Sequence, residues 1–411
     1  MGDKYYNRSF ALISEYGKLA VEVLQRQLTQ RGYKPHVHFE LEGGYIPQSS
    51  THRTGHDTLD YDTINQALAG MSIQGRLKPE YWHYQWEYVS TFQGQSPLKV
   101  AADLESVIKI LPALLKYNGA EEVFIKPVLW DGDRGRLAPG CDTIFSAETK
   151  SVHVPNAIQI NISAVDANNE NVIPNQGIGE SLQRCLLVTS YECSLLYLPE
   201  QEAFDRLRLK EQFGLSRELC SPNDLSGGHQ GSIALYKEKG KHNQLMGDIP
   251  LLYDSKHSVI ASRQEWRPLS RIEHRLGASS KLFNPYVNTA FALANLSDAL
   301  TTSSKNVDQI GGRQLAGSKY DAKCGPDADS KPRQLPDSLY SCCDKLGAVE
   351  LFECGVWLEN KINQCVRDTR SNKIEPVPDD LGSLLKQAIL SFYEKGVAIP
   401  RNSKLWAPLR Y

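Results

Sequence analysis

The sequence predicts an α+β protein, in which amphipathic helices flank a sheet whose strands each carry one polar face. Three segments read as strands with a polar face, at residues 36–42, 81–89 and 271–275. Apolar residues recur at helical spacing between these segments, and the last part of the chain carries helical patterns. Strands and helices are therefore both expected, with helices forming the end of the chain.

The composition is that of an ordinary globular protein. The chain has 411 residues, of which 41% are hydrophobic and 23% charged, enough to bury a large core. No run of about 18 apolar residues could span a bilayer, and the N-terminus lacks the features of a secretory signal. The net charge of -2 gives no electrostatic support for a nucleic-acid partner, and the nine cysteines form no CxxC pair. We expect a cytoplasmic protein without a membrane or nucleic-acid partner.

The chain begins with a helix that leads into a strand. Residues 8–31 place apolar side chains on one helical face, and Gly32 supplies a natural stop. The strand at 36–42 follows, and a loop rich in Gly, Ser, Thr and Asp is expected over 43–75 before the second strand.

The middle of the chain alternates helices and strands. A helix is expected over 100–117 with a kink at Pro112, then a strand over 122–128. A strand at 157–165 places three isoleucines on one side and Gln159, Asn161 and Ser163 on the other. The remaining expected elements are helices at 178–197, 200–213 and 287–300, strand pieces at 249–253 and 258–262, loops at 130–150, 221–232 and 302–334, and C-terminal helices within 337–368 and 379–395.

The polar faces of the three strands carry a mixture of carboxylates and arginines. These residues are Glu40, Glu42, Glu87, Arg271, Glu273 and Arg275. Residues two apart on a strand lie roughly 6.5 Å apart, so Glu40 and Glu42 suit two neighbouring cations better than one. Hard oxygen ligands favour Mg²⁺ or Mn²⁺, and arginines beside them can grip phosphate oxygens bidentately. The mixture indicates phosphoryl transfer.

Each motif alone also has an ordinary structural explanation. An ExE strand is commonly a solvated face, and an RxExR strand is commonly a surface ladder of ion pairs. The conjunction of the two motifs is the informative observation.

The order of these motifs resembles the glutamine synthetase family. The stretch RIEHRLGASSKLFNPYVNTAFALANLSDAL, residues 271–300, is similar to the family's RxExR strand followed by NPY and a helix of small residues. ELE at 40–42, QWEYVSTFQGQ at 85–95, FIKP at 124–127 and the late helices after residue 335 resemble further family segments. The resemblance covers residues 8–368 and implies a curved, mainly antiparallel sheet flanked by helices.

The resemblance also implies an activity and a set of site residues. Family members use ATP and two metal ions to phosphorylate the γ-carboxylate of glutamate, and ammonia then displaces the phosphate. By position, Glu42 and Glu87 would hold the metal nearer the acid, and Glu40 and Glu273 the metal that meets ATP. Arg271 would face ATP and Arg275 the substrate or transferred phosphate. Further matches are Arg263 and Arg267 as phosphate-binding arginines and Lys126 in the PKP-like strand.

The sequence also departs from the family pattern. Gln159 replaces a metal-binding histidine, and the second glutamate of the GQ turn falls near Gln95. Neutral amide oxygens bind divalent cations more weakly than carboxylates do. The family's catalytic flap has no clear counterpart over 221–257. Only about 35 residues precede the ExE strand, so we expect no β-rich N-terminal domain and not the family's full ring, although a smaller homo-oligomer is possible.

Some other polar residues are weaker candidates. His36 and His38 share the face of Glu40 and could replace the missing histidine ligand, or be ordinary strand histidines. Asp131, Asp133 and Arg134 could reach a phosphate or metal, but a solvated loop is the favoured explanation for them. His229 lies in a Gly-rich loop that could act as a lid, although GGHQG matches no reliable phosphate-binding pattern.

Three functions remain open from the sequence. The first is an ATP- and Mg²⁺-dependent ligase joining a small acid, glutamate or an analogue, to ammonia or an amine through an acyl phosphate. The second is a decayed relative that keeps the fold as a binding or regulatory module, and the third is a phosphotransferase without ligation. We expect the catalytic domain over 1–370 and a helical extension over 371–411.

Overall fold

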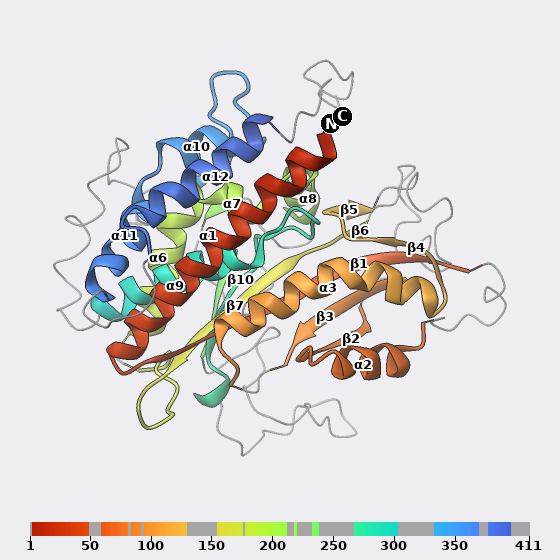
Figure 1. The fold of residues 1–411 in the computed structure, drawn as a ribbon, viewed down its shortest axis with the longest axis horizontal. Coiled ribbons are helices and arrows are strands. Elements are labelled where there is room, and N and C mark those ends of the chain that lie inside the picture. Colours follow the sequence, from red (N-terminus) through yellow and green to blue (C-terminus); the bar gives the residue numbers. More distant parts are fainter. Residues whose placement is uncertain are drawn as a thin grey trace.

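The computed structural model describes eleven stretches of the chain: residues 2–48, 59–80, 84–91, 94–129, 154–175, 177–211, 218–219, 232–237, 267–302, 333–369 and 377–395. A sheet of seven strands lies at its centre, and helices pack on one side of it (Figure 1). The strands of this sheet are β1 (Lys34–Pro47), β2 (Gly75–Pro79), β3 (Gln85–Ser90), β4 (Ala120–Phe124), β7 (Ile158–Val165), β9 (Ile233–Tyr236) and β10 (Arg271–His274).

The sheet is antiparallel and is organised around β1. The strand order is β2-β3-β1-β7-β10-β9, and the end of β1 pairs with β4. Every strand pair runs antiparallel, which confirms the predicted α+β class with a mainly antiparallel sheet. Two further strand pairs lie outside it: β5 (Val128–Leu129) with β6 (Val154–Pro155), and β8 (Glu218–Leu219) with β11 (Arg333–Gln334).

The helices cover the apolar face of the sheet. In Figure 1, α1 (Gly2–Gln30) and α3 (Pro97–Tyr117) cross in front of the strands, and both contact β1. Behind them lies α9 (Pro285–Thr302), which packs against α1, α3 and α6 (Ile178–Glu192). Nearly every residue of α9 is buried, including the polar Asn288, Thr289 and Asn295, because helices and the sheet pack around it. The other helices are α2 (Tyr61–Gly70), α7 (Ser194–Tyr197), α8 (Gln201–Glu211), α10 (Ala348–Cys354), α11 (Trp357–Thr369) and α12 (Leu381–Lys395).

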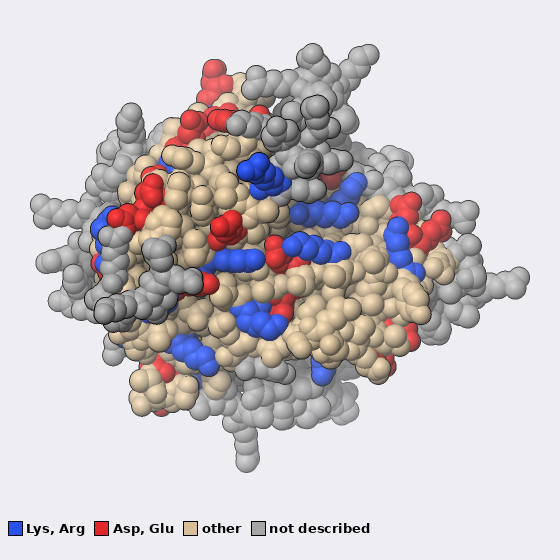
Figure 2. Space-filling model, viewed as in Figure 1, with Lys and Arg blue, Asp and Glu red and all other residues tan. Residues whose placement is uncertain are grey.

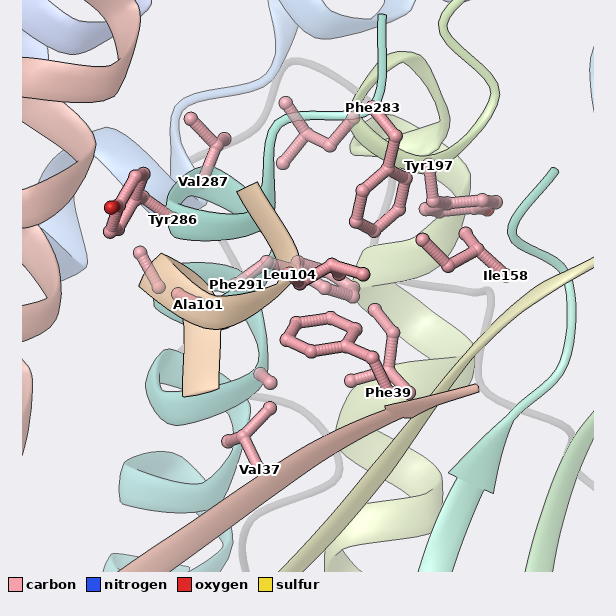
Figure 3. Close-up of a cluster of buried hydrophobic side chains, with 14 of the residues drawn as sticks. Val37, Phe39, Ala101, Leu104, Ile158, Tyr197, Phe283, Tyr286, Val287 and Phe291 are labelled. Carbon is pink, nitrogen blue, oxygen red and sulfur yellow. The ribbon is translucent and has the colours of Figure 1, made fainter. Parts of the chain in front are cut away.

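The main core joins the sheet to these helices. Figure 3 shows Val37 and Phe39 of β1 facing Leu104 of α3 and Phe291 of α9. The rings of Phe39 and Phe283 meet edge to face, 6.0 Å apart. Because alternate strand residues point to opposite faces, burying these side chains turns the polar residues of β1 to the other side.

The expected loop over 43–75 is wrong in part. The strand β1 continues to Pro47, and α2 and β2 occupy most of the described residues before the second strand. The Asp60 side chain caps α2 by accepting from the Thr63 amide at 3.0 Å, and Ile64 and Leu68 are buried one turn apart. The sequence did not predict this short helix, because the polar residues around it are typical of a loop.

Smaller differences concern boundaries. The strand expected at 81–89 begins at Gln85, and the segment 122–128 contributes to both β4 and β5. The helix expected over 178–197 divides into α6 and α7. The strand pieces at 249–253 and 258–262 and the loop at 130–150 lie outside the described residues. So does the loop expected at 302–334, apart from residue 302, which ends α9, and residues 333–334, which form β11.

The surface over α1 and α3 mixes the two signs of charge. Figure 2 shows Lys and Arg separated by uncharged residues and by Asp and Glu on the described part of this face. Within the described residues, no helix is both long enough and apolar enough to cross a membrane.

Candidate functional site

The polar face of the sheet collects residues from four neighbouring strands, β3, β1, β7 and β10. In register, Glu42 of β1 lies opposite Glu87 of β3, and Glu40 lies opposite Gln159 of β7. Glu273 of β10 lies opposite Asn161 of β7, with Arg271 two residues before it. The sheet therefore brings Glu40, Glu42, Glu87, Gln159, Arg271 and Glu273 onto one face, and Arg275 follows directly after β10.

At the β1–β3 end, two buried carboxylates meet cationic and amide donors. The Glu42 carboxylate accepts a hydrogen bond from the Ala157 amide at 2.7 Å. Glu87 pairs with Lys78 of β2, with 2.7 Å between Oε2 and Nζ. Burial, followed by the charge of Glu40, raises the pKa of Glu87 to about 8, although Lys78 opposes the shift. This end of the face carries an excess of negative charge that favours a cation or a proton.

At the β10 end, Glu273 is fully buried between two arginines. Its Oε2 lies 3.4 Å from Arg271 Nη2, and its Oε1 lies 3.3 Å from Arg275 Nε. Arg271 also donates from Nε to Asn161 at 2.7 Å, and its guanidinium lies 4.6 Å from the centroid of the Tyr236 ring. These contacts fix both arginines beside one carboxylate.

Asn161 links the two ends of the face. Its amide nitrogen donates to Glu40 Oε1 at 3.0 Å, while its oxygen accepts from Arg271. The neighbouring Gln159 is 5% exposed, and its side-chain oxygen has no hydrogen-bond partner among the described residues. A buried acceptor without a donor is costly, and a bound cation or ligand would satisfy it.

His36 and His38 lie on the same face and are buried. Their ring centroids are 6.4 Å apart. Burial, with a smaller effect of Lys34, lowers the pKa of His36 to about 4. Burial, with smaller effects of His36 and Arg271, lowers the pKa of His38 to about 3. Both rings are therefore neutral at pH 7, the form that can bind a metal.

The other predicted site residues lie further from this network. Lys126 follows β4, and its carbonyl accepts from Asn156 at 3.1 Å. Arg267 is exposed in the short 3-10 helix Arg267–Leu269 before β10. Gln95 follows β3, and its amide donates to the Thr91 carbonyl at 2.5 Å. Outside the described residues lie Arg263, Asp131, Asp133, Arg134 and His229. The segment 221–257, in which the sequence shows no clear counterpart of the flap, also lies outside them apart from residues 232–237.

Arg206 of α8 is a site residue that the sequence reasoning missed. It is 1% exposed and donates to the carbonyl oxygens of Leu276 at 3.0 Å and Arg275 at 3.4 Å. Burial lowers its pKa to about 10, while the charge of Glu42 opposes the shift. The sequence offered one indication of this burial. Arg206 lies between the apolar Phe204 and Leu207 in a segment predicted to be helical, where its side chain would be buried with theirs.

Lys78 and Glu80 were missed for a different reason. Both belong to the segment at the end of β2, a strand that the polar composition did not reveal. Glu80 lies close enough to Glu87 for its charge to contribute to the raised pKa. The additional acidic residue near Glu87 is therefore Glu80. The position matched to the family's second glutamate carries the neutral Gln95.

A pH prediction arises from His274, which faces the core rather than the site. Its Nε2 lies 3.0 Å from Ser190 Oγ, and burial lowers its pKa from 6.5 to about 3. Below pH 6.5 the imidazole of His274 is therefore protonated in the unfolded chain, whereas it stays neutral in the folded protein down to about pH 3. The contribution of His274 to the free energy of unfolding is complete above pH 6.5 and falls as the pH drops. For one proton this slope is about 1.4 kcal/mol per pH unit.

The variant His274→Gln keeps a side chain that can bond Ser190 but does not titrate. We expect its free energy of unfolding to fall less steeply than that of the wild type between pH 6 and 4, measured by urea denaturation. Equal slopes would contradict a neutral, buried His274. Because His36 and His38 still titrate, the variant should retain part of the dependence.

Comparison with known proteins identifies the fold. No protein-family model matches the chain, and no curated protein sequence matches it. Among solved structures, a crystal structure of a novel glutamine synthase homolog is 12% identical with a TM-score of 0.52, over 94% of this chain and 72% of the other. Plasmodium falciparum glutamine synthetase is 13% identical with a TM-score of 0.53, over 93% and 77%. GmaS in complex with ADP is 13% identical with a TM-score of 0.50, over 92% and 74%. The chain therefore has a glutamine synthetase-like fold.

Proposed function

We propose that this chain is an ATP- and Mg²⁺-dependent ligase that joins a small carboxylic acid to ammonia or an amine through an acyl phosphate. Glutamate or an analogue is the default acid. The observation that carries the proposal is the single face of the sheet on which Glu40, Glu42 and Glu87 meet Arg271 and Arg275. The fold supports it, because the similar solved structures include a glutamine synthetase and GmaS with ADP.

The chemistry of the donors fits a divalent cation at one position of this face. Glu40 and Gln159 are register partners, and the buried Gln159 oxygen has no hydrogen-bond partner among the described residues. Oxygen donors of this kind suit Mg²⁺ or Mn²⁺. Glu273 would complete the set, sharing its carboxylate with two arginines. A Mg²⁺ ion held there would withdraw charge from the phosphates of ATP.

The second position, at Glu42 and Glu87, fits a divalent cation less well. The two carboxylates lie opposite each other, and burial, followed by the charge of Glu40, raises the pKa of Glu87. However, Lys78 already supplies a cation to Glu87. No step of the proposed reaction depends on a metal ion at this position.

The arginines would act on the negative charge of the reaction. A guanidinium fork binds phosphate or carboxylate oxygens bidentately and stabilises charge on a phosphoryl group in transfer. In this proposal Arg275 faces the acid or the transferred phosphate, and Arg271 and Arg267 face ATP, with Arg263 and Lys126 as further phosphate contacts. Arg206 would hold the main chain of Arg275 in place through its two carbonyl contacts.

Hydroxylamine provides a direct test of the reaction class. As a nucleophilic amine it would convert an acyl phosphate into a hydroxamate, which is measured by its coloured iron complex. We expect hydroxamate to form only when Mg²⁺, ATP and the correct acid are all present, across a panel of small mono- and dicarboxylic acids. Stable phosphorylated acid without hydroxamate would favour a phosphotransferase instead.

A second candidate function has its own supporting observation. Two features would weaken metal binding on the polar face. Lys78 already pairs with the carboxylate of Glu87, and Gln159 offers a neutral amide oxygen where the family has a histidine. A decayed relative acting as a binding or regulatory module would bind ATP but release no ADP, whichever acid and amine were added.

The organisation of the molecule completes the proposal. We propose a cytoplasmic protein with the catalytic domain over 1–370, a helical extension over 371–411, and assembly, if any, into a homo-oligomer smaller than the full ring. In the described residues, α12 packs against α1 and α11. Expression of residues 1–370 alone would test whether the extension is dispensable, with circular dichroism and thermal unfolding as the readout.

A further inference from the structure

We propose that the ammonium group of Lys78 takes the place of one of the two divalent cations, so that the protein binds a single Mg²⁺ ion on the polar face. The inference rests on the proposed function and specifies its metal requirement. It starts from the contact between Lys78 Nζ and Glu87 Oε2, which are 2.7 Å apart.

The position of Lys78 is set by the sheet. It lies directly opposite Glu87 in the β2–β3 pair, and Glu87 lies directly opposite Glu42 in the β3–β1 pair. The three side chains therefore form one row across neighbouring strands on the same face. The side chain of Lys78 is 55% exposed, whereas that of Glu87 is 5% exposed, so the stem runs along the surface and its charged end reaches a buried carboxylate.

The charges around Lys78 resemble those around a bound metal ion. Burial acts to lower the pKa of Lys78, but Glu87, Glu80 and Glu40 together raise it above its ordinary value. Three carboxylates, one in β1, one in β3 and one directly after β2, thus act on one ammonium group. An ammonium has three donors, and it can satisfy carboxylate oxygens that would otherwise bind a hard divalent ion.

A divalent ion at Glu87 would have to displace Lys78. The ion needs the same carboxylate oxygens, and the two cations would repel each other at that distance. At the other position, Glu40 and Gln159 offer oxygen donors, and Arg271 is held by Asn161 and Glu273. One cation position is therefore taken by Lys78 and one is left for Mg²⁺.

The number of bound Mn²⁺ ions per chain tests this inference without depending on activity. Free Mn²⁺ is measured by its electron paramagnetic resonance signal during titration of the full chain. We expect one bound Mn²⁺ for the wild type and two for Lys78→Met, and the double variant Lys78→Met/Glu87→Gln should return to one. Lys109→Met is the matched control, because Lys109 lies on α3 and pairs with Glu105 outside the polar face.

The possible outcomes separate the inference from the proposed function. Two Mn²⁺ ions in the wild type, or one in both the wild type and Lys78→Met, would overturn the role of Lys78 and leave the ligase proposal standing. No Mn²⁺ in either folded protein would overturn both. Lys78→Gln provides a second variant of this edge-strand residue, and thermal unfolding of each protein confirms that it is folded.

Discussion

Arg206→Met is expected to lower the free energy of unfolding by about 2–4 kcal/mol. The guanidinium is 1% exposed and donates to two main-chain carbonyl groups, those of Arg275 and Leu276. Methionine fills most of the space but leaves both carbonyl groups without this donor, and each lost partner of a buried acceptor costs about 1–3 kcal/mol. It also removes the positive charge near Glu42. Urea denaturation monitored by circular dichroism measures the change.

Arg208→Met serves as the control for this substitution. Arg208 lies on the same helix, is exposed, and pairs with Asp205. An exposed ion pair contributes about 1 kcal/mol or less, so we expect a change within that range. If the two variants were equally stable, Arg206 would not hold the segment after β10.

Arg275→Lys is expected to reduce the rate of the proposed ligation by about 10²- to 10³-fold, with little change in stability. Its side chain is 11% exposed and lies against Glu273. Lysine keeps the charge but loses the planar fork that matches a carboxylate or phosphate, and the removal of one such group in a preorganised site costs rates of this order. Hydroxamate formation measures the effect at saturating Mg²⁺ and ATP.

Arg208→Lys is the matched control, and it should retain wild-type activity. The KM for the acid distinguishes two roles of Arg275. A loss confined to KM would place Arg275 in ground-state binding alone, whereas a loss in kcat supports stabilisation of the transferred group. Full activity of Arg275→Lys would contradict a role in either.

Local patterns were enough to predict the principal strands and their polar faces. The alternation in 36–42 turns Glu40 and Glu42 to the same side, and the alternation in 157–165 does the same for Gln159 and Asn161. These features depend on neighbours in the chain, and the structure confirms them.

Interactions across the sheet could not be predicted in the same way. Asn161 connects Glu40 to Arg271 only because β7 lies between β1 and β10, and strand order is a property of the whole fold. Lys78 reaches Glu87 only through the register of β2 and β3. The burial of Arg206 depends on how α8 packs, which the helical pattern alone leaves open.

The two arginines at Glu273 also change how the site is understood. From the sequence, Glu273 was expected to hold a metal ion with Glu40. The structure adds an arginine at each carboxylate oxygen of Glu273, so any cation there must compete with two ion pairs. The metal role of Glu273 remains a prediction, and neutralising this side chain tests it.

Calorimetric titration of ATP, with and without Mg²⁺, is the most direct test that the polar face is a nucleotide site. We expect micromolar binding that requires Mg²⁺ and that Glu273→Gln weakens by about tenfold or more, roughly 1.4 kcal/mol. Glu359→Gln, on α11 and away from the sheet, should bind as the wild type does. Absence of ATP binding by the folded wild-type protein, with or without Mg²⁺, would contradict the account.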